Sequence, residues 1–263
     1  MEAAALTHAV AGRPRAFVAV TGPDAEDYLQ RMLSNDVEAL APGESCQALL
    51  LTPKARVIAP MRVLRRGSED FLLLTEPELG ETLRDQLLRM RFAAKAEISL
   101  EEHTSTLVFG GGQGIANDDY GAPAVEVLDA ALEPTLGEDE LEALRIRAGT
   151  PRFGREIDDR VLPAEAGLVD RAVSLTKGCY PGQEPIARLH YRGHANRGLR
   201  VLAIDGDEPP TADAELAYEG KAVGRVTSSV RADGGIVALA YVRAEVPGDA
   251  ELDLGRSKAR PLH

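Results

Sequence analysis

The sequence predicts an α+β fold that ends in a small antiparallel β-barrel. Over about the first hundred residues, apolar strand patterns alternate with two amphipathic helix patterns. The last seventy residues or so contain short strand patterns joined by glycine turns, and no helix pattern interrupts them. The first arrangement is typical of helices on one face of a mainly antiparallel sheet, and the second is typical of a barrel or sandwich.

The first region contains six strand patterns and two helix patterns. The first helix begins at Pro23 and carries its apolar residues on one face: Tyr28, Leu29, Met32 and Leu33. The second begins with 75–78, Thr-Glu-Pro-Glu, which we interpret as a capping box, and then stacks Leu79, Leu83 and Leu87. The expected strands are 17–20, 48–51, 56–64, 71–74, 96–100 and 104–109.

The middle of the chain becomes irregular. A short strand is expected at 124–128 and a helix at 138–147, which Gly149 ends. The glycine cluster at 110–114 does not have the spacing of a dinucleotide-binding motif, and we interpret it as a loop that closes a strand. From 150 to 196 the periodicity fades. Irregular stretches of that length inside a domain are usually functional.

The last part predicts a separate C-terminal β-barrel domain at 196–263, after a first region at 1–195 with lobes at about 1–110 and 111–195. The expected barrel strands are 199–204, 215–218, 222–228, 236–242 and 251–254. Hairpin turns are expected at 219–220 and 233–235, where glycines occur.

Composition limits the function classes. The 263 residues are 44% hydrophobic and carry a net charge of −12, which argues against a general nucleic-acid binder because such a protein needs a dominant basic face. No apolar run approaches the length of a membrane span, and the first eight residues lack the features of a secretory signal. We therefore expect a cytoplasmic protein without a membrane partner.

Cysteine and histidine spacing argues against a resident metal centre. The two cysteines, Cys46 and Cys179, lie far apart, so the chain has no CxxC pair for a zinc ribbon and too few thiolates for a four-cysteine iron–sulfur cluster. His190 and His194 have the i, i+4 spacing of a metal pair. Gly193 weakens the helix that such a pair needs, and no third ligand is evident, so no metal site is predicted.

The most specific string is KGCYPGQE at 177–184. Cys179 follows Lys177-Gly178 in a stretch with a second glycine, where a nearby ammonium would favour the thiolate and the backbone could approach a ligand. The alternative is that the lone cysteine is a small buried hydrophobic residue, which is the commoner role.

The KGCYPGQE string resembles the signature of the YgfZ-type folate-binding proteins, which are relatives of the glycine cleavage T-protein (aminomethyltransferase). The similarity extends to LRIRAGTPRFGRE at 144–156, to PAEAGL at 163–168, to the opening around 22–37 and to the strand and turn at 50–56. The resemblance implies the three-lobed T-protein fold, with ferredoxin-like N-terminal layers and a C-terminal antiparallel β-barrel. It also implies tetrahydrofolate or a derivative as cofactor, and iron–sulfur clients or assembly proteins as partners.

The chain departs from the T-protein at its catalytic positions. The T-protein has an acidic pair that helps the folate amine react, and the matching positions here are Ala59 and Pro60. Neither side chain takes or gives a proton, so aminomethyl transfer by that mechanism is not expected. Thr75 replaces an asparagine that contacts the ligand in the T-protein.

Two folate contacts of the T-protein keep their residue type. Its pterin-binding glutamate matches Glu126, whose carboxylate suits the N–H donors of a pterin edge. Its folate-site arginine matches Arg145, whose guanidinium suits a carbonyl or carboxylate. The resemblance also implies that Tyr180, Gln183 and Glu184 contribute to the cofactor site. Without the resemblance, Glu126 would be interpreted as a solvated strand residue and Arg145 as a surface cation.

A short basic stretch runs through Arg188, Arg192, Arg197 and Arg200. It is either ordinary surface charge or an attraction for an anionic folate tail or an acidic partner. Three functional hypotheses remain. The first is a folate-binding accessory protein for iron–sulfur enzymes that uses Cys179, with Lys177 beside it, and that need not be an enzyme. The second is a folate-dependent one-carbon transferase with a relocated acid, and the third is a binding module whose pocket is a remnant.

Overall fold

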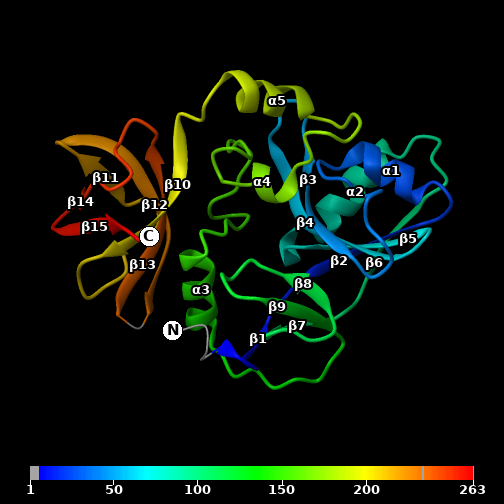
Figure 1. The fold of residues 1–263 in the computed structure, drawn as a ribbon, viewed down its shortest axis with the longest axis horizontal. Helices are drawn as coiled ribbons and strands as arrows, with labels where there is room; N and C mark the ends of the chain where they lie inside the picture. Colours follow the sequence, from blue (N-terminus) through cyan, green and yellow to red (C-terminus); the bar gives the residue numbers. More distant parts are fainter. Residues whose placement is uncertain (1–5, 233, 263) are drawn as a thin grey trace.

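Two antiparallel sheets and a closed barrel surround the centre of the molecule, as Figure 1 shows. The computed structural model describes residues 6–232 and 234–262. Met1–Ala5, Asp233 of the expected 233–235 turn, and His263 lie outside the described residues. The barrel is on the left of Figure 1, the five-stranded sheet is on the right, and the four-stranded sheet lies below them.

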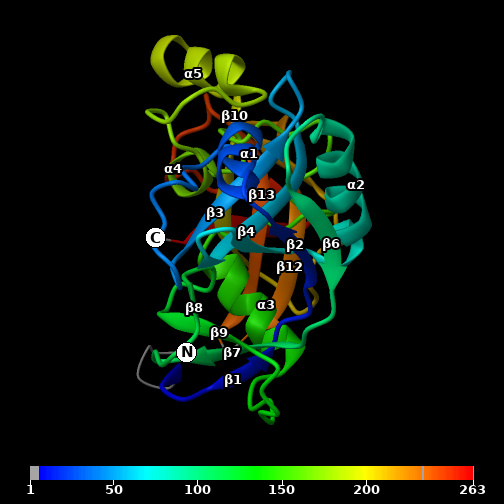
Figure 2. The ribbon, with the colours of Figure 1, turned by 90° about the vertical axis from the view of Figure 1, so that its right-hand side faces the viewer.

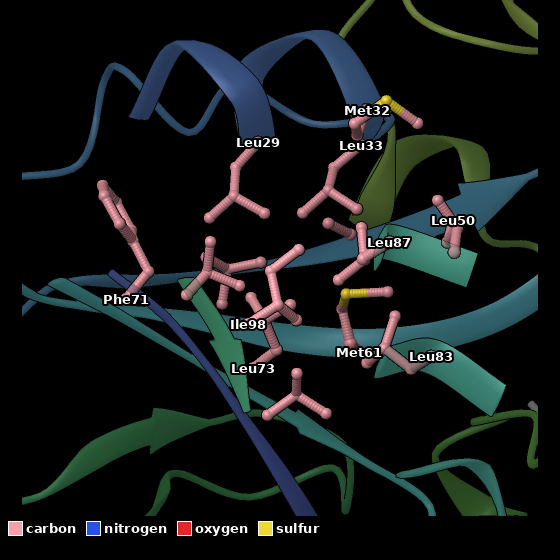
Figure 3. Close-up of a cluster of buried hydrophobic side chains, with 14 of the residues drawn as sticks. Leu29, Met32, Leu33, Leu50, Met61, Phe71, Leu73, Leu83, Leu87 and Ile98 are labelled. Carbon is pink, nitrogen blue, oxygen red and sulfur yellow. The ribbon is translucent and has the colours of Figure 1, made fainter. Parts of the chain in front are cut away.

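The five-stranded sheet comes entirely from the first region, and all its strand pairs are antiparallel. Its order is β3 (Ser45–Leu51), β4 (Val57–Gly67), β5 (Asp70–Thr75), β2 (Ala16–Thr21), β6 (Glu97–Glu101). Alternate residues of each strand face opposite sides of the sheet. The side chains on one face of the sheet, including those of Met61, Phe71 and Leu73, pack against helices, as Figure 3 shows.

Two helices cover that face, as the sequence predicts. Helix α1 (Ala25–Met32) directs Leu29 at the sheet, and α2 (Gly80–Met90) contributes Leu83 and Leu87. The expected capping box before α2 is wrong. Thr75 is the last residue of β5, its hydroxyl donates to the carbonyl oxygen of Pro60 at 2.7 Å, and a 3-10 turn, η2 (Pro77–Leu79), precedes the helix.

The four-stranded sheet joins distant parts of the chain. Its order is β1 (Val10–Gly12), β7 (Ser105–Phe109), β9 (Ala124–Leu128), β8 (Ile115–Asn117). The glycine loop after β7 leads into β8, and Gly110, Gly111, Gly112 and Gly114 all have positive φ there. The expected division at residue 110 therefore cuts through one sheet, because strands from both sides of it pair together.

A histidine links the two sheets at the segment between β6 and β7. The ring of His103 makes a 2.9 Å contact with Glu101, at the end of β6, and a 2.7 Å contact with Asp129, just after β9. Arg66 of β4 in turn holds Glu101 through two hydrogen bonds. The hydrogen bonds to Glu101 and Asp129 raise the pKa of His103 above its ordinary value.

The segment 150–196 is more regular than its sequence indicates. After α3 (Glu138–Arg147), it contains the short helix α4 (Val169–Ala172) and the ten-residue helix α5 (Gln183–Arg192), both in the upper part of Figure 1. Pro181 and Gly182, which indicate a loop, lie just before α5, and Gly193 ends it. We predicted no helix here because the residues around the helix, rich in Gly and Pro, hide its short apolar pattern.

The C-terminal strands form a closed barrel. Its order is β10 (Arg197–Ile204), β13 (Gly235–Arg243), β12 (Lys221–Ala232), β11 (Glu215–Tyr218), β14 (Leu252–Leu254), β15 (Ser257–Pro261). The final strand, β15, pairs with β10 and closes the barrel, and it was not expected from the sequence. The predicted fold class, α+β with a C-terminal antiparallel barrel, is confirmed.

The barrel packs on the rest of the molecule through α3, as the two views in Figures 1 and 2 show. Ala143 and Ile146 of α3 lie in one apolar cluster with Val230, Val237 and Leu239 of the barrel. Within the described part of the chain, no helix has the length and apolar character needed to cross a membrane.

Candidate ligand-binding site

A cavity of about 990 Å³ lies where the three parts of the fold meet. The five-stranded sheet contributes Pro60 and Arg62, the segment from β1 to β2 contributes Arg13 and Arg15, and the barrel contributes Val230. Helix α3 and the chain after it complete the wall. Seven arginines line the cavity: Arg13, Arg15, Arg62, Arg145, Arg152, Arg155 and Arg171. A volume of this size accommodates a drug-sized or cofactor-sized molecule.

The positions that match the T-protein's acidic pair present no carboxylate here. Pro60 lines the cavity, whereas Ala59 is fully buried in the core beneath the helices. Thr75 is also fully buried, and its hydroxyl donates to Pro60. None of these three positions therefore offers the cavity a side chain that could take or give a proton.

Glu126 is buried and already fully hydrogen-bonded. It lies on β9 with no exposed surface, so the alternative of a solvated strand residue is wrong. One carboxylate oxygen accepts from Arg15 Nη2 at 2.6 Å and Asn117 Nδ2 at 2.7 Å, and the other from Arg15 Nε at 3.2 Å and Ser105 Oγ at 2.9 Å. Burial acts to raise the pKa of Glu126, but Arg15 outweighs it and lowers the pKa to about 2.

Arg15 and Arg62 lie on either side of one carboxylate in the cavity wall. Asp119 Oδ2 is 4.0 Å from Arg15 Nη2, and its Oδ1 is 3.5 Å from Arg62 Nη2. Arg62 is 6% exposed, and its Nε is buried with no hydrogen-bond partner among the described residues. Asp118 accepts a further bond from Arg62 at 3.2 Å. This wall therefore places two guanidiniums among three carboxylates, those of Asp118, Asp119 and Glu126.

Arg13 is held in the wall by Glu76. The guanidinium donates to both oxygens of Glu76, at 2.7 and 3.1 Å. Burial acts to raise the pKa of Glu76, but Arg13 outweighs it, so the pKa lies below its ordinary value. A carboxylate with a lowered pKa is a weak proton acceptor.

Arg145 is also buried, which excludes the alternative of a surface cation. It lines the cavity from α3, and it donates to both oxygens of Glu142, at 2.7 and 2.9 Å, and to Glu156 at 3.0 Å. Burial acts to lower its pKa, but these carboxylates outweigh it and raise the pKa above the ordinary value.

Glu156 joins the cavity wall to the barrel. It is 1% exposed, and besides Arg145 it accepts from the backbone N–H of Arg152 at 3.0 Å and from Ser228 Oγ on β12 at 2.6 Å. The hydroxyl of Tyr241 on β13 donates to its backbone carbonyl at 2.8 Å. The side chain of one residue thus connects α3, the following loop and the barrel.

Lys177 has a structural environment away from the cavity. Its Nζ donates to the carbonyl oxygens of Gln30, Leu33 and Asn35, at and just beyond the C-terminal end of α1. Three acceptors satisfy the three N–H donors of an ammonium, and a cation is favourable at a helix C-terminus. Burial lowers the pKa of Lys177 to about 8. This ammonium therefore binds the C-terminal end of α1, and these contacts do not support the expected role of Lys177 in favouring the thiolate of Cys179.

The two cysteines differ in exposure. Cys179 is exposed, in the loop before α5, whereas Cys46 lies half-buried on β3 and packs against the helix-covered core. Burial raises the pKa of the Cys46 thiol to about 11. The alternative that Cys179 is a buried hydrophobic residue is therefore wrong.

The other residues of the 177–184 string hold the loop in place. Tyr180 is buried in an apolar cluster, Gln183 accepts from the backbone N–H of Tyr180 at 3.3 Å, and Glu184 is exposed. Gly182 has φ of +85°, and a Cβ there would lie 2.7 Å from the carbonyl oxygen of Thr52. Among the described residues, none of the 177–184 string lines the cavity, so the structure does not bring Tyr180, Gln183 or Glu184 to Arg145.

No group of three or more His, Cys, Asp or Glu side chains within residues 6–232 and 234–262 is placed to hold a metal ion. His190 lies in α5, and its ring packs against Tyr191 at 4.9 Å, while His194 lies beyond the helix.

The basic stretch divides between two surroundings. Arg197 pairs with Glu165 at 3.0 Å and lies over the ring of Tyr241, and Arg200 donates to the carbonyl oxygen of Pro247. Arg188 and Arg192 lie exposed on α5. The stretch therefore does not form one patch.

Sequence reasoning missed Arg13, Arg15 and Arg62 as cavity residues. Arg13 and Arg15 alternate along an extended segment, a spacing that places both side chains on one side. That spacing could have identified them, but nothing local shows that the segment faces a cavity.

Comparison with known proteins agrees with this architecture. The chain is 28% identical to the tRNA-modifying protein YgfZ of Edwardsiella ictaluri, over 89% of this chain and 83% of that protein. It is 26% identical to an uncharacterized protein of Haemophilus influenzae, over 92% and 91% of the two chains. No family model matches the chain.

Among solved structures, the aminomethyltransferase T of the glycine cleavage system from Bartonella henselae superposes with a TM-score of 0.82 at 21% identity. The match covers 98% of this chain and 85% of that one. The predicted resemblance is therefore confirmed: the chain is similar to YgfZ-type proteins and has the fold of the glycine cleavage aminomethyltransferase.

Proposed function

We propose that the central cavity binds a reduced folate and that the protein acts in the cytoplasm as an accessory to iron–sulfur enzymes. The proposal that the protein binds folate rests on the cavity of about 990 Å³, which has seven arginines in its walls. A reduced folate carries a pterin ring system at one end and two carboxylates on its tail. Guanidinium groups bind carboxylates bidentately, and a cavity of this volume suits a ligand of this size.

Arg145 is one candidate to hold the ligand. It lines the cavity, and Glu142 and Glu156 fix its guanidinium in orientation. A preorganised donor loses less freedom when a ligand binds, which favours affinity.

Binding without aminomethyl transfer is the form of this function that the chemistry supports. Pro60 gives the wall no carboxylate where the T-protein has its acidic pair. The hypothesis of a relocated acid has candidates in Glu76 and Asp119, which line the cavity. Glu76 is ion-paired with a lowered pKa, so it is a poor base for this role.

The proposed role as an accessory protein depends on Cys179 and on the similarity to the YgfZ proteins. The thiol is exposed on a loop that Lys177 and Gly182 fix to the N-terminal region. The YgfZ relatives are named tRNA-modifying proteins. A net charge of −12 favours a contribution through partner enzymes over direct binding of tRNA.

Titration of the purified protein with tetrahydrofolate tests the proposal. We expect binding in the micromolar range, and Arg145→Ala should weaken it by about 1.5–3 kcal/mol, the usual contribution of a hydrogen bond to a charged group. An aminomethyl-loaded carrier protein should release no ammonia in the presence of folate. The absence of folate binding would refute the folate half, and ammonia release at the rate of a T-protein would refute the exclusion of transfer.

The cysteine is tested separately in cells that lack the protein. Cys179→Ser should keep the melting temperature and the folate affinity of the wild type but fail to restore iron–sulfur enzyme activity. Full restoration by the serine variant would refute the role of the thiol.

A further inference from the structure

Helix α5 is held on the molecule by little burial. Only Ile186 of its ten residues is buried, and it packs in an apolar cluster with Leu51 and Val57. A helix of this length is marginal on its own, so this packing and the loop before the helix keep α5 in place. The helix lies at the upper edge of the molecule in Figures 1 and 2, and none of its ten described residues lines the cavity. Its outer side chains are therefore free for another purpose.

The outer side of α5 carries residue types that are common in protein interfaces. Arg188, Tyr191 and Arg192 are exposed, and their i, i+3, i+4 spacing places them on one face of the helix, which we call the α5 face. Tyr191 is 67% exposed, and the ring of His190 meets it edge-on with 4.9 Å between the ring centroids. Tyrosine and arginine are enriched among the residues that contribute most to protein–protein binding.

The α5 face carries positive charge that the protein leaves unpaired. Within residues 6–232 and 234–262, the side chains of Arg188 and Arg192 make no ion pair and no hydrogen bond. Glu184 is the one carboxylate of the helix, and the turn that packs against Gly182 adds the exposed Lys54. In a protein with a net charge of −12, this is a local positive surface. Its electrostatic complement is a surface rich in carboxylates.

Two other anions fit the α5 face less well. The carboxylate tail of a ligand in the cavity does not meet this face, because α5 contributes nothing to the cavity wall. An RNA would have its phosphates neutralised by many cations, whereas the face offers two guanidiniums on a protein of net charge −12. A folded protein needs only a few carboxylates and a contact for the tyrosine ring.

We propose that the α5 face docks a partner protein through a carboxylate-rich surface of that partner. The inference deepens the proposed accessory function and rests on it for the role of the partner. The loop that carries the exposed Cys179 leads directly into α5, and Cys179 lies four residues before Gln183. Four residues of chain span at most about 14 Å, so a protein docked on α5 lies close to the thiol.

The test places a photoreactive probe on the α5 face of the full-length protein. Tyr191 is replaced by p-benzoylphenylalanine, and the protein is irradiated in cells that lack the wild-type copy. The same probe is introduced together with Arg188→Glu and Arg192→Glu. The matched control carries Arg231→Glu and Arg256→Glu, which change the net charge equally at two exposed barrel arginines. Melting temperatures and titration with tetrahydrofolate, which should match the wild type, report on the fold and the cavity.

We expect irradiation to give adducts that resist nuclease and are destroyed by protease. The attached peptide, sequenced by mass spectrometry, should carry Asp or Glu beside the point of attachment. Charge reversal on the α5 face should lower the adduct yield at least about tenfold, because like charges would then face each other across the contact. The barrel control should change the yield by less than about twofold, since salt screens charges beyond about 10 Å.

Three crosslinking results would overturn the inference: no adduct, an adduct that nuclease destroys, or a yield that α5 reversal lowers no more than the barrel control does. The last arm measures iron–sulfur enzyme activity in the same cells. If Cys179→Ser fails to restore activity but the variant with Arg188→Glu and Arg192→Glu restores it fully, the inference is overturned and the accessory function stands. If the adducts follow the expected charge dependence but Cys179→Ser restores activity, the docking surface stands and the accessory function fails.

Discussion

Removal of the Glu156 carboxylate should destabilise the whole molecule, because this side chain connects the cavity wall to the barrel. The change Glu156→Ala leaves three donors without their acceptor: the guanidinium of Arg145, the backbone N–H of Arg152 and the hydroxyl of Ser228. All three contacts are 3.0 Å or shorter, and Glu156 is 1% exposed.

The magnitude follows from these contacts. Breaking a buried ion pair by removing one partner costs about 3–5 kcal/mol, mostly because a charge is left uncompensated. Arg145 keeps both oxygens of Glu142, so its charge stays partly compensated, and we expect the lower end, about 3 kcal/mol. Glu156→Gln keeps an acceptor and the side-chain volume, and should cost about 1–2 kcal/mol.

Urea denaturation followed by far-ultraviolet circular dichroism measures both variants. A loss of about 3 kcal/mol also corresponds to a fall in melting temperature of about 6–12 °C for a protein of this size. The matched control is Glu251→Ala, which removes an exposed carboxylate paired with Arg260 and Lys258 and should produce no measurable loss. If Glu156→Ala were as stable as this control, the assignment of Glu156 as the connection between wall and barrel would be refuted.

Three further predictions use simpler measurements. With limiting alkylating reagent at pH 7, mass spectrometry should find Cys179 labelled well before Cys46, because burial raises the pKa of Cys46 to about 11; equal labelling would contradict this. The raised pKa of His103 means that its contacts with two carboxylates contribute stability that is fully present below about pH 6.5, the ordinary pKa of histidine, and is lost as the pH rises through the folded-state pKa. The difference in urea midpoint between the wild type and His103→Gln should therefore shrink on going from pH 6 to pH 9. A constant difference would contradict a stabilising contribution from protonated His103. Gly182→Ala should cost about 2 kcal/mol or more because of its positive φ and the close carbonyl oxygen, whereas Gly178→Ala, with no heavy atom within 4 Å, should keep the wild-type melting temperature; equal losses would show that the backbone at 182 adapts.

Two regular elements were predictable because a glycine closely follows them. The helix at 138–147 and the strand at 215–218 have their expected bounds, and Gly149 and Gly220, both with positive φ, lie two residues beyond them. The division of the N-terminal strands into two sheets was not predictable, because β1 and β7 pair across almost a hundred residues. Strand β15 was missed because its alternation, with charged residues facing out, resembles a polar tail.

The candidate site was predictable by residue type but not by arrangement. The resemblance identified Glu126 and Arg145, and both are buried near the cavity. It could not show that Arg15 covers Glu126, since their side chains meet only when the segment between β1 and β2 lies beside β9. Lys177 was expected beside Cys179 because they are neighbours in sequence, but its long side chain reaches the end of α1 instead.

The cavity wall draws on residues from Ala11 to Val230, which has a consequence for synthesis on the ribosome. Chains begin to fold from the N-terminus as they emerge, and the five-stranded sheet with α1 and α2 is complete by Glu101. The cavity has no closed wall until β12 has been translated. A ligand in the cell therefore cannot guide the early steps of folding, and the arginine-rich segments must be held by their own carboxylate partners until the barrel arrives.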